Sequence, residues 1–407
     1  MTRRNDKPVV QTRPRRLLLC LDGVPHKLIL AAKERGLFDR FGPPTRLLSP
    51  FPTMTNVALS AMFGASPPAG YESLYFDRRA GELRGGIRKY LGRRTPDKIP
   101  SSYMDDLDYQ EPLPFEFLIY VAPDRVWRAD MQRFRERFRA TPQNRDYFAF
   151  LKATDGLLHA QGPSRLNIAL ESLDKILTEI QKHCGNETEI VMFSDHGMNL
   201  EENRRVDLMT RLRRHGYQIV PRFAEKRRRA LSVPAFGLCS YAAVYCGDEE
   251  LVPEVATRIV EIPGVDFVVY RDGNEVAIEG QNGSARIERR ENSYRYTVRN
   301  GNPLELNEHE FVDDATWFEQ SNANRYPDAV VNIYKSLFTP RVKHTADVLI
   351  SLKDGYYYGW SPFGRFVRLV ATHGNALQSS SNAFLMSTHR TLPECVRADD
   401  ARPLLVA

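Results

Sequence analysis

The segment RLLLCLDG (residues 16–23) places an aspartate directly after a run of apolar residues that is typical of a buried strand. Three further segments combine an apolar run with acidic or imidazole side chains and a glycine: YFAFLKATDGLLH (147–159), EIVMFSDHG (189–197) and FVRLVATHG (366–374). Open α/β sheets bind ligands just beyond the carboxyl ends of their strands. We therefore expect these distant segments to converge on one polar crevice.

Strand-like and helix-like segments alternate along much of the chain. Residues 16–64 read as strand, helix, strand and helix, and the pattern resumes with a strand at 115–121 and a charged helix at 123–140. Residues 163–183 open with a proline and carry apolar side chains at three-to-four spacing, which predicts an amphipathic helix. The alternation predicts an α/β fold with a mostly parallel central sheet and helices on both faces.

The character of the chain changes near residue 221, where β-type segments separated by Asp-Gly and Asn-Gly turns indicate hairpins. We interpret residues 221–320 as a smaller α+β insertion. The main α/β domain then comprises residues 16–220 and 321–407, because His373 must return to the shared crevice. Residues 1–15 are basic and are expected to form a flexible tail.

Six side chains at the ends of the apolar runs are of the types that bind hydrolytic divalent metals. They are Asp22, Asp155, His159, Asp195, His196 and His373. Carboxylates and imidazoles are the ligands that such metals prefer, and six of them can hold two ions with positions left for a substrate. Asp155 and His159 lie four residues apart, so one helical turn would place both on the same face. The first hypothesis is therefore a two-metal hydrolase.

The order of these motifs resembles that of the alkaline phosphatase superfamily, in its type I phosphodiesterase and nucleotide pyrophosphatase branch. The matching elements, in chain order, are Asp22, PTMT at 52–55, Asp155 to His159, SDHG at 194–197 and THG at 372–374. The resemblance covers most of residues 16–220 and 325–388. It implies an alkaline phosphatase-like fold around a two-metal site.

The resemblance also implies roles for individual residues. One metal takes Asp155, His159 and His373, and the other takes Asp22, Asp195 and His196 with the Thr55 oxygen as a further ligand. Thr55 is the implied nucleophile, with Thr53 as its rival, and either threonine could instead cap a helix that opens here. Asn56 is a candidate donor to a phosphoryl oxygen. Asp and His ligands suit Zn²⁺, and Mn²⁺ or iron also fits them.

Several functions remain open on this site. The leading interpretation is a phosphodiesterase or nucleotide pyrophosphatase that binds a small-molecule phosphoester, with specificity in residues 65–112 and in the insertion. Alternatives are a phosphomonoesterase, a phosphonate hydrolase or a phosphomutase, and a catalytically inactive binding protein that retains the fold. Sulfatases need Cys or Ser followed by Pro and Arg, which Thr55-Asn56-Val57 does not supply.

The composition excludes some classes of partner. Residues 1–16 hold six Arg or Lys and one Asp, so the rest of the chain is near neutral despite the net charge of +6, and no nucleic-acid surface is indicated. No apolar run approaches the roughly 18 residues of a membrane span, and LLLCL at 17–21 is too short for a signal-peptide core. Five cysteines without CxxC spacing fit free thiols. We predict a cytoplasmic location, and the sequence indicates no oligomeric state.

Overall fold

A computed structural model defines the fold, and it describes residues 15–86, 118–185, 187–223, 229–339, 341–359 and 368–406. Apart from Arg15, the predicted basic tail lies outside these residues. The same holds for 87–112, the larger part of the segment in which substrate specificity was expected.

Within the described residues, no helix combines the length and apolar character needed to cross a bilayer. All five cysteines are free thiols, as the sequence predicts.

The sheet that carries the polar motifs has six strands in the order β20-β2-β19-β6-β1-β5. Their bounds are Cys395–Arg397 (β20), Thr45–Leu48 (β2), Asn382–Ser387 (β19), Ile190–Phe193 (β6), Leu17–Leu21 (β1) and Tyr147–Leu151 (β5). β1 runs parallel to β5 and β6, and β2 runs parallel to β20, whereas β19 is antiparallel to both of its neighbours. The prediction of a mostly parallel sheet is confirmed.

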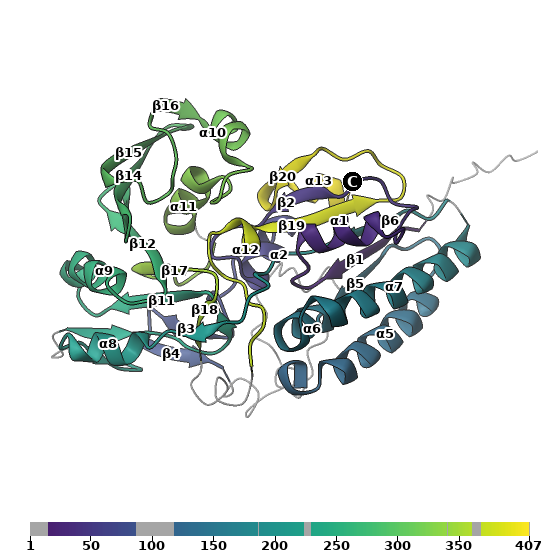
Figure 1. Ribbon diagram of the computed structural model, residues 1–407, viewed down its shortest axis with the longest axis horizontal. Helices are drawn as coiled ribbons and strands as arrows, with labels where there is room; N and C mark the ends of the chain where they lie inside the picture. Colours follow the sequence, from purple (N-terminus) through teal and green to yellow (C-terminus); the bar gives the residue numbers. More distant parts are fainter. Residues whose placement is uncertain are drawn as a thin grey trace, which may run out of the picture.

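Helices cover both faces of this sheet, and β1 shows why. Leu17, Leu19 and Leu21 alternate with Leu18 and Cys20, so one strand contributes to two separate cores. On one face lie α1 (His26–Glu34), α5 (Pro123–Ala140), α6 (Ala153–Gln161) and α7 (Pro163–Cys184); on the other lie α2 (Thr55–Phe63) and α13 (Arg402–Val406) (Figure 1). The α/β fold with helices on both faces is therefore confirmed.

Two of the expected strands are absent from the described residues. Residues 118–121, the described part of the strand expected at 115–121, are helical. The described part of the strand expected at 366–373 has no regular strand, and only Thr372 forms an isolated bridge, with Asn199. Both predictions were wrong because short apolar runs do not by themselves distinguish a strand from other buried backbone.

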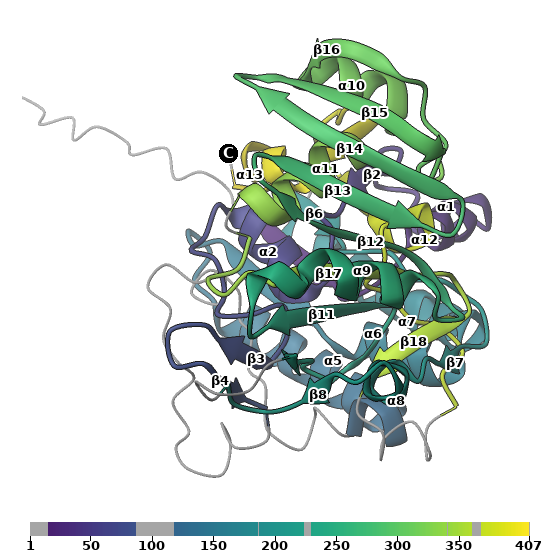
Figure 2. The same cartoon turned by 90° about the vertical axis from the view of Figure 1, so that its left-hand side faces the viewer.

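A second sheet has nine strands in the order β16-β15-β14-β13-β12-β17-β11-β9-β8. Their bounds are His309–Asp313, Ser293–Gly301, Gly283–Arg290, Glu275–Gly280, Val265–Asp272, Val348–Leu352, Tyr241–Cys246, Ala230–Ser232 and Gln218–Ile219, in that order. The hairpins expected at Asp272-Gly273 and Asn282-Gly283 join β12 to β13 and β13 to β14. Figure 2 shows α9 (Val252–Val260) in front of this sheet and α10 (Asp314–Ser321) and α11 (Ala329–Phe338) behind it.

The second sheet includes strands from outside the insertion predicted at 221–320. β17, from residues 348–352, lies between β11 and β12, and β8 contributes residues 218–219. The domain boundaries themselves stay a prediction. The remaining elements of the described residues are β3 (Leu74–Asp77), β4 (Glu82–Gly85), β7 (Arg204–Arg205), α8 (Leu208–Arg214), β10 (Leu238–Cys239), β18 (Tyr356–Gly359), α12 (Gln378–Ser381) and two short 3-10 helices (Glu249–Leu251 and Ala398–Asp400).

Candidate active site

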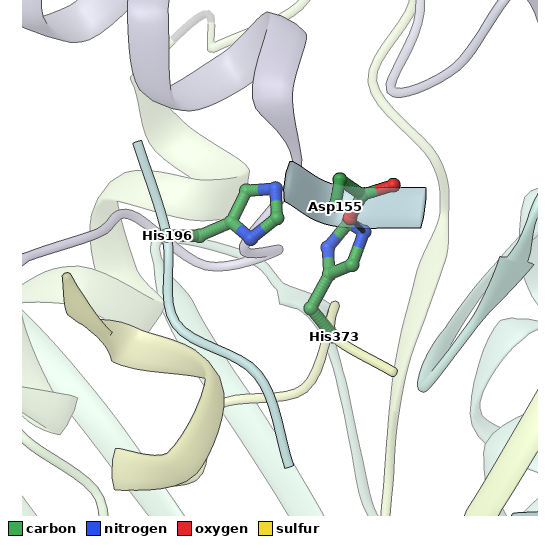
Figure 3. Close-up of side chains that lie close together, drawn as sticks. All are labelled: Asp155, His196 and His373. Carbon is green, nitrogen blue, oxygen red and sulfur yellow. Dashed lines mark ion pairs between the residues drawn. The ribbon is translucent and has the colours of Figure 1, made fainter. Parts of the chain in front are cut away.

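Six buried side chains meet at the carboxyl ends of the strands of the first sheet. They are Asp22, Asp155, His159, Asp195, His196 and His373. Figure 3 shows Asp155 from α6 and His196 and His373 from two loops, with their side chains pointing toward one another. The sheet topology explains this convergence, because β1 lies between β5 and β6 and the polar segments after all three strands emerge at one edge.

Local structure fixes where each side chain lies. Asp22 directly follows β1, and Asp195 and His196 follow the end of β6. Asp155 is not at a strand end, because β5 stops at Leu151; it lies in the first turn of α6, and His159 lies one turn later on the same helix. The i, i+4 spacing therefore places both side chains on one helical face.

The contacts link the six side chains into one cluster. His159 Nε2 lies 3.2 Å and His373 Nε2 3.7 Å from Asp155 Oδ1. His196 Nε2 lies 3.2 Å from Asp195 Oδ2 and 3.7 Å from Asp22 Oδ1. The His196 and His373 rings stack with centroids 3.7 Å apart, so the two halves adjoin.

Two groups of three have all their ligand atoms within 4.8 Å of one another: Asp22 with Asp195 and His196, and Asp155 with His196 and His373. The first group is the set that the resemblance assigns to one metal. In the second group, His196 occupies the place that the resemblance gives to His159. His159 reaches the cluster through its contact with Asp155.

Backbone carbonyl groups orient all three imidazoles. Nδ1 of His159 lies 2.7 Å from Ala371 O, that of His196 lies 3.0 Å from Gly197 O, and that of His373 lies 2.8 Å from Thr53 O. A carbonyl oxygen only accepts, so each Nδ1 carries a proton, and in the neutral form of each ring the lone pair of Nε2 points into the cluster. This is the tautomer that binding a metal through Nε2 requires.

The pKa values of the three histidines shift in different directions, although burial acts to lower each of them. Burial lowers the pKa of His196 to about 4, and burial together with the neighbouring His196 lowers that of His373 to about 3. Burial also acts to lower the pKa of His159, but the adjacent Asp155 carboxylate outweighs it and raises that pKa. His196 and His373 are therefore neutral at neutral pH and available as ligands.

The carboxylates have oxygens that the described residues leave without a hydrogen-bond partner. Asp155 Oδ1 and Asp195 Oδ2 are both buried and unsatisfied in this way. Burial raises the pKa of Asp195 to about 6 and that of Asp22 well above its usual value. Buried carboxylate oxygens without partners are costly, and bound cations would satisfy them. The donor set therefore fits divalent metal ions.

The two candidate nucleophiles have different surroundings. Thr55, the first residue of α2, is half-buried, and its Oγ1 lies 3.4 Å from Asp22 Oδ1 and 3.2 Å from His196 Nε2. Thr53 is fully buried, and its Oγ1 donates to Asn375 O at 3.2 Å and accepts from Gly374 N at 2.8 Å. Only the Thr55 hydroxyl faces the cluster.

Asn56 is the second residue of α2 and is half-buried beside Thr55. Gly23, Thr154 and Ser194, to which the sequence patterns gave no individual role, support the cluster through hydrogen bonds. Gly23 N donates to Asp195 Oδ1 at 3.0 Å, Thr154 Oγ1 donates to Asp22 O at 2.7 Å, and Ser194 Oγ donates to Val24 O at 2.7 Å. The available signal was that each of the three directly precedes or follows a ligand-type aspartate.

The chain belongs to the type I phosphodiesterase / nucleotide pyrophosphatase family, whose model matches residues 80–287. The match includes Asp155, His159, Asp195 and His196. It confirms the family indicated by the motifs, and it identifies the protein as a hydrolase of phosphoric esters. No match was found among curated proteins.

Solved structures share the fold at low sequence identity. Phosphonoacetate hydrolase from Sinorhizobium meliloti 1021, in complex with phosphonoformate, is 17% identical with a TM-score of 0.53, covering 97% of this chain and 95% of that chain. Human ectonucleotide pyrophosphatase / phosphodiesterase 5 is 14% identical with a TM-score of 0.50, covering 96% and 93%. An inactive Thr-to-Ala variant of the murine protein, in complex with AMP, is 14% identical with a TM-score of 0.50, covering 96% and 94%. The expected alkaline phosphatase-like fold is confirmed.

Proposed function

We propose that this protein hydrolyses phosphodiesters or nucleotide pyrophosphates, with Thr55 as nucleophile and two divalent metal ions as cofactors. The observation that carries the proposal is the Thr55 hydroxyl beside the ligand-type cluster, 3.4 Å from Asp22 Oδ1 and 3.2 Å from His196 Nε2. Family membership supports the reaction class. The inactivity of the murine Thr-to-Ala variant, which binds AMP, supports a threonine in the catalytic role.

The ligands that we propose are the six side chains of the cluster and Thr55. One ion would be held by Asp155, His159 and His373, and the other by Asp22, Asp195, His196 and the Thr55 oxygen. When bound, the ions supply positive charge against the phosphoryl oxygens and lower the pKa of a coordinated hydroxyl. Zn²⁺ suits these donors, and Mn²⁺ and iron are alternatives.

Groups of the chain itself would bind and orient the phosphoryl group. α2 begins at Thr55, its first turn holds no acidic residue, and within the described residues it has no side-chain cap, so its first amides can donate to an anion. We assign Asn56 to donating its side-chain amide to a phosphoryl oxygen. Because the hydroxyl of Thr53 is engaged with Gly374 and Asn375, Thr55 Oγ1 is the group left to attack phosphorus.

The nucleophile is tested by Thr55→Ala, with Thr55→Ser as the matched control that keeps a hydroxyl. The alanine variant is expected to keep its fold and most of its metal and to lose turnover of a nitrophenyl phosphodiester by about 10³-fold or more. The serine variant is expected to retain measurable turnover. Circular dichroism and elemental analysis check fold and metal content. Normal turnover by the alanine variant would show that another group attacks.

Phosphonate hydrolysis is the second candidate, and the observation in its favour is the fold shared with phosphonoacetate hydrolase over 97% of this chain. A panel containing a phosphodiester, a phosphomonoester and phosphonoacetate separates the candidates by their relative kcat/KM. We expect the diester to be preferred. A preference for the monoester would favour a phosphatase, and release of phosphate from phosphonoacetate alone would favour the phosphonatase.

The same panel also tests the two remaining alternatives. An inactive binding protein would hydrolyse no member of the panel, and a phosphomutase would transfer phosphate within a molecule without releasing it.

We propose a cytoplasmic location because all five cysteines are free, and free thiols persist in reducing compartments. Fractionation of cells that produce the full chain tests the compartment.

A further inference from the structure

Two buried asparagines connect the loop after Asp195-His196 to the segment that precedes His373. Asn199 and Asn203 are exposed to only 1% and 8%. Asn199 N donates to Thr372 O at 2.8 Å, Thr372 N donates to Asn199 Oδ1 at 3.1 Å, and Asn203 N donates to Leu369 O at 2.9 Å. Residues 199–203 therefore lie alongside residues 369–372.

The side chains of the two asparagines also bind each other. Nδ2 of Asn199 donates to Oδ1 of Asn203 at 3.1 Å, and Nδ2 of Asn203 donates to Oδ1 of Asn199 at 3.1 Å. Asn203 Nδ2 donates in addition to Glu201 O at 2.6 Å. Because Asn199 Oδ1 accepts from both Asn203 and Thr372, removing either amide leaves a buried polar group without its partner.

His373 lies in a loop, where hydrogen bonds to Thr53 and Ser240 hold the residue itself, and the asparagine pair adjoins the segment that leads into it. Asp22 and Asp195 follow paired strands, and Asp155 and His159 lie on α6. Residues 368–371 form no strand, so the contacts with 199–203 replace a strand ladder there. The loop that holds His196 has its own anchor, because Gly197 N donates to Ser380 O at 2.7 Å.

We propose that Asn199 and Asn203 are positioning residues that hold His373 against Asp155 and thereby set the affinity of one of two metal sites. This inference rests on the proposed function. Loss of the pair loosens the segment before His373, while Asp22, Asp195 and His196 keep their supports. The two metal affinities therefore separate, which a general loss of stability would not produce.

The test is a titration of the metal-free full chain with Zn²⁺ in competition with a chromophoric chelator. The variants are Asn199→Ala and Asn203→Ala. The control is Asn167→Ala on α7, which removes an exposed hydrogen bond from the Arg35 guanidinium to Asn167 Oδ1. For Asn199→Ala we expect one site to keep its affinity and the other to weaken by about 10- to 100-fold. Asn203→Ala leaves the Asn199–Thr372 contact, so its selective loss is expected to be smaller. The control is expected to match the wild type.

Other outcomes would overturn the inference. Equal weakening of both sites, or no weakening in either variant, would show that the pair has no positioning role. If Asn199→Ala fails to fold, Asn203→Ala alone decides, with its unfolding temperature measured metal-free. Failure of the proposed function looks different, because the wild-type chain would then lack a Zn²⁺ site or would hydrolyse no phosphodiester.

Discussion

Each ligand-type histidine owes its orientation to a backbone carbonyl from another part of the chain or from the next residue. His373 depends on Thr53 in this way, and Thr53 binds the same loop twice more through Gly374, by its backbone N–H and by its side chain. The rival threonine thus supports the loop that carries His373, while Thr55 faces the cluster. The sequence alone left the two threonines as rivals because their difference lies in tertiary contacts.

Gly23 has no room for a side chain beside Asp155. It has φ of +69°, and an added Cβ would lie 2.9 Å from Asp155 Oδ1 and 2.9 Å from Met198 Cε. Gly23→Ala is expected to lower the free energy of unfolding by about 1–2 kcal/mol through backbone strain and also to lower metal content by displacing Asp155. Urea unfolding and elemental analysis measure the two effects.

Gly81 provides the matched control for that variant. Its φ is +65°, but an added Cβ would meet nothing within 4 Å. Gly81→Ala is expected to cost a similar amount of stability and to keep all of its metal. Equal metal content in both alanine variants would contradict the close approach of Gly23 to Asp155.

Helix α6 carries two of the six ligand-type side chains, and its first amides need a hydrogen-bond acceptor. Lys152, its N-cap residue, offers no side-chain cap bond. Asp130 of α5, far from α6's N-terminus in sequence, supplies the cap, because its buried Oδ2 accepts from Ala153 N at 2.9 Å. A carboxylate on one helix therefore caps the next one and ties α5 to the site.

The buried cap predicts a pH dependence. Burial raises the pKa of Asp130 to about 6, above the roughly 3.9 of an unfolded aspartate, so the native state binds the proton more tightly. The stabilisation that comes from protonating Asp130 in the native state is fully present below about pH 4. It is lost as the pH rises through about 6, which lowers the free energy of unfolding by up to roughly 3 kcal/mol. Urea unfolding of the wild type and of Asp130→Asn at pH 4, 5, 6 and 7 measures this effect. As the pH rises, the difference in free energy of unfolding should shift in favour of the asparagine variant. A difference that stays constant over this range would contradict the raised pKa.

The sequence predicted elements where local pattern decides them. β1, β2, β6, α1 and α7 follow from apolar runs or three-to-four spacing. The pattern failed at 118–121 and 368–373, the described parts of two expected strands, because a short apolar run is compatible with a helix or a loop as well as with a strand. It also gave no sign that β17 lies in the middle of the second sheet, because pairing between residues about 80 apart in sequence leaves no local trace.

The two large sheets are connected through the loop that carries His373. Ser240, which precedes β11 of the second sheet, donates its N–H to His373 O at 2.7 Å, and its Oγ accepts from Asn375 N at 3.0 Å. Thr53, before α2 of the first layer, holds the same loop from the other side. One ligand-type histidine is thus fixed by both parts of the molecule.

The central claim is that six buried side chains bind two cations beside Thr55. It is tested most directly by elemental analysis of the purified full chain before and after chelation, with phosphodiester turnover measured on the same samples. We expect about two divalent ions per chain, loss of turnover and a lower unfolding temperature when the ions are removed, and recovery of both when Zn²⁺ is restored. A chain that holds no divalent ion, or that turns over diester equally well after chelation, would contradict the account.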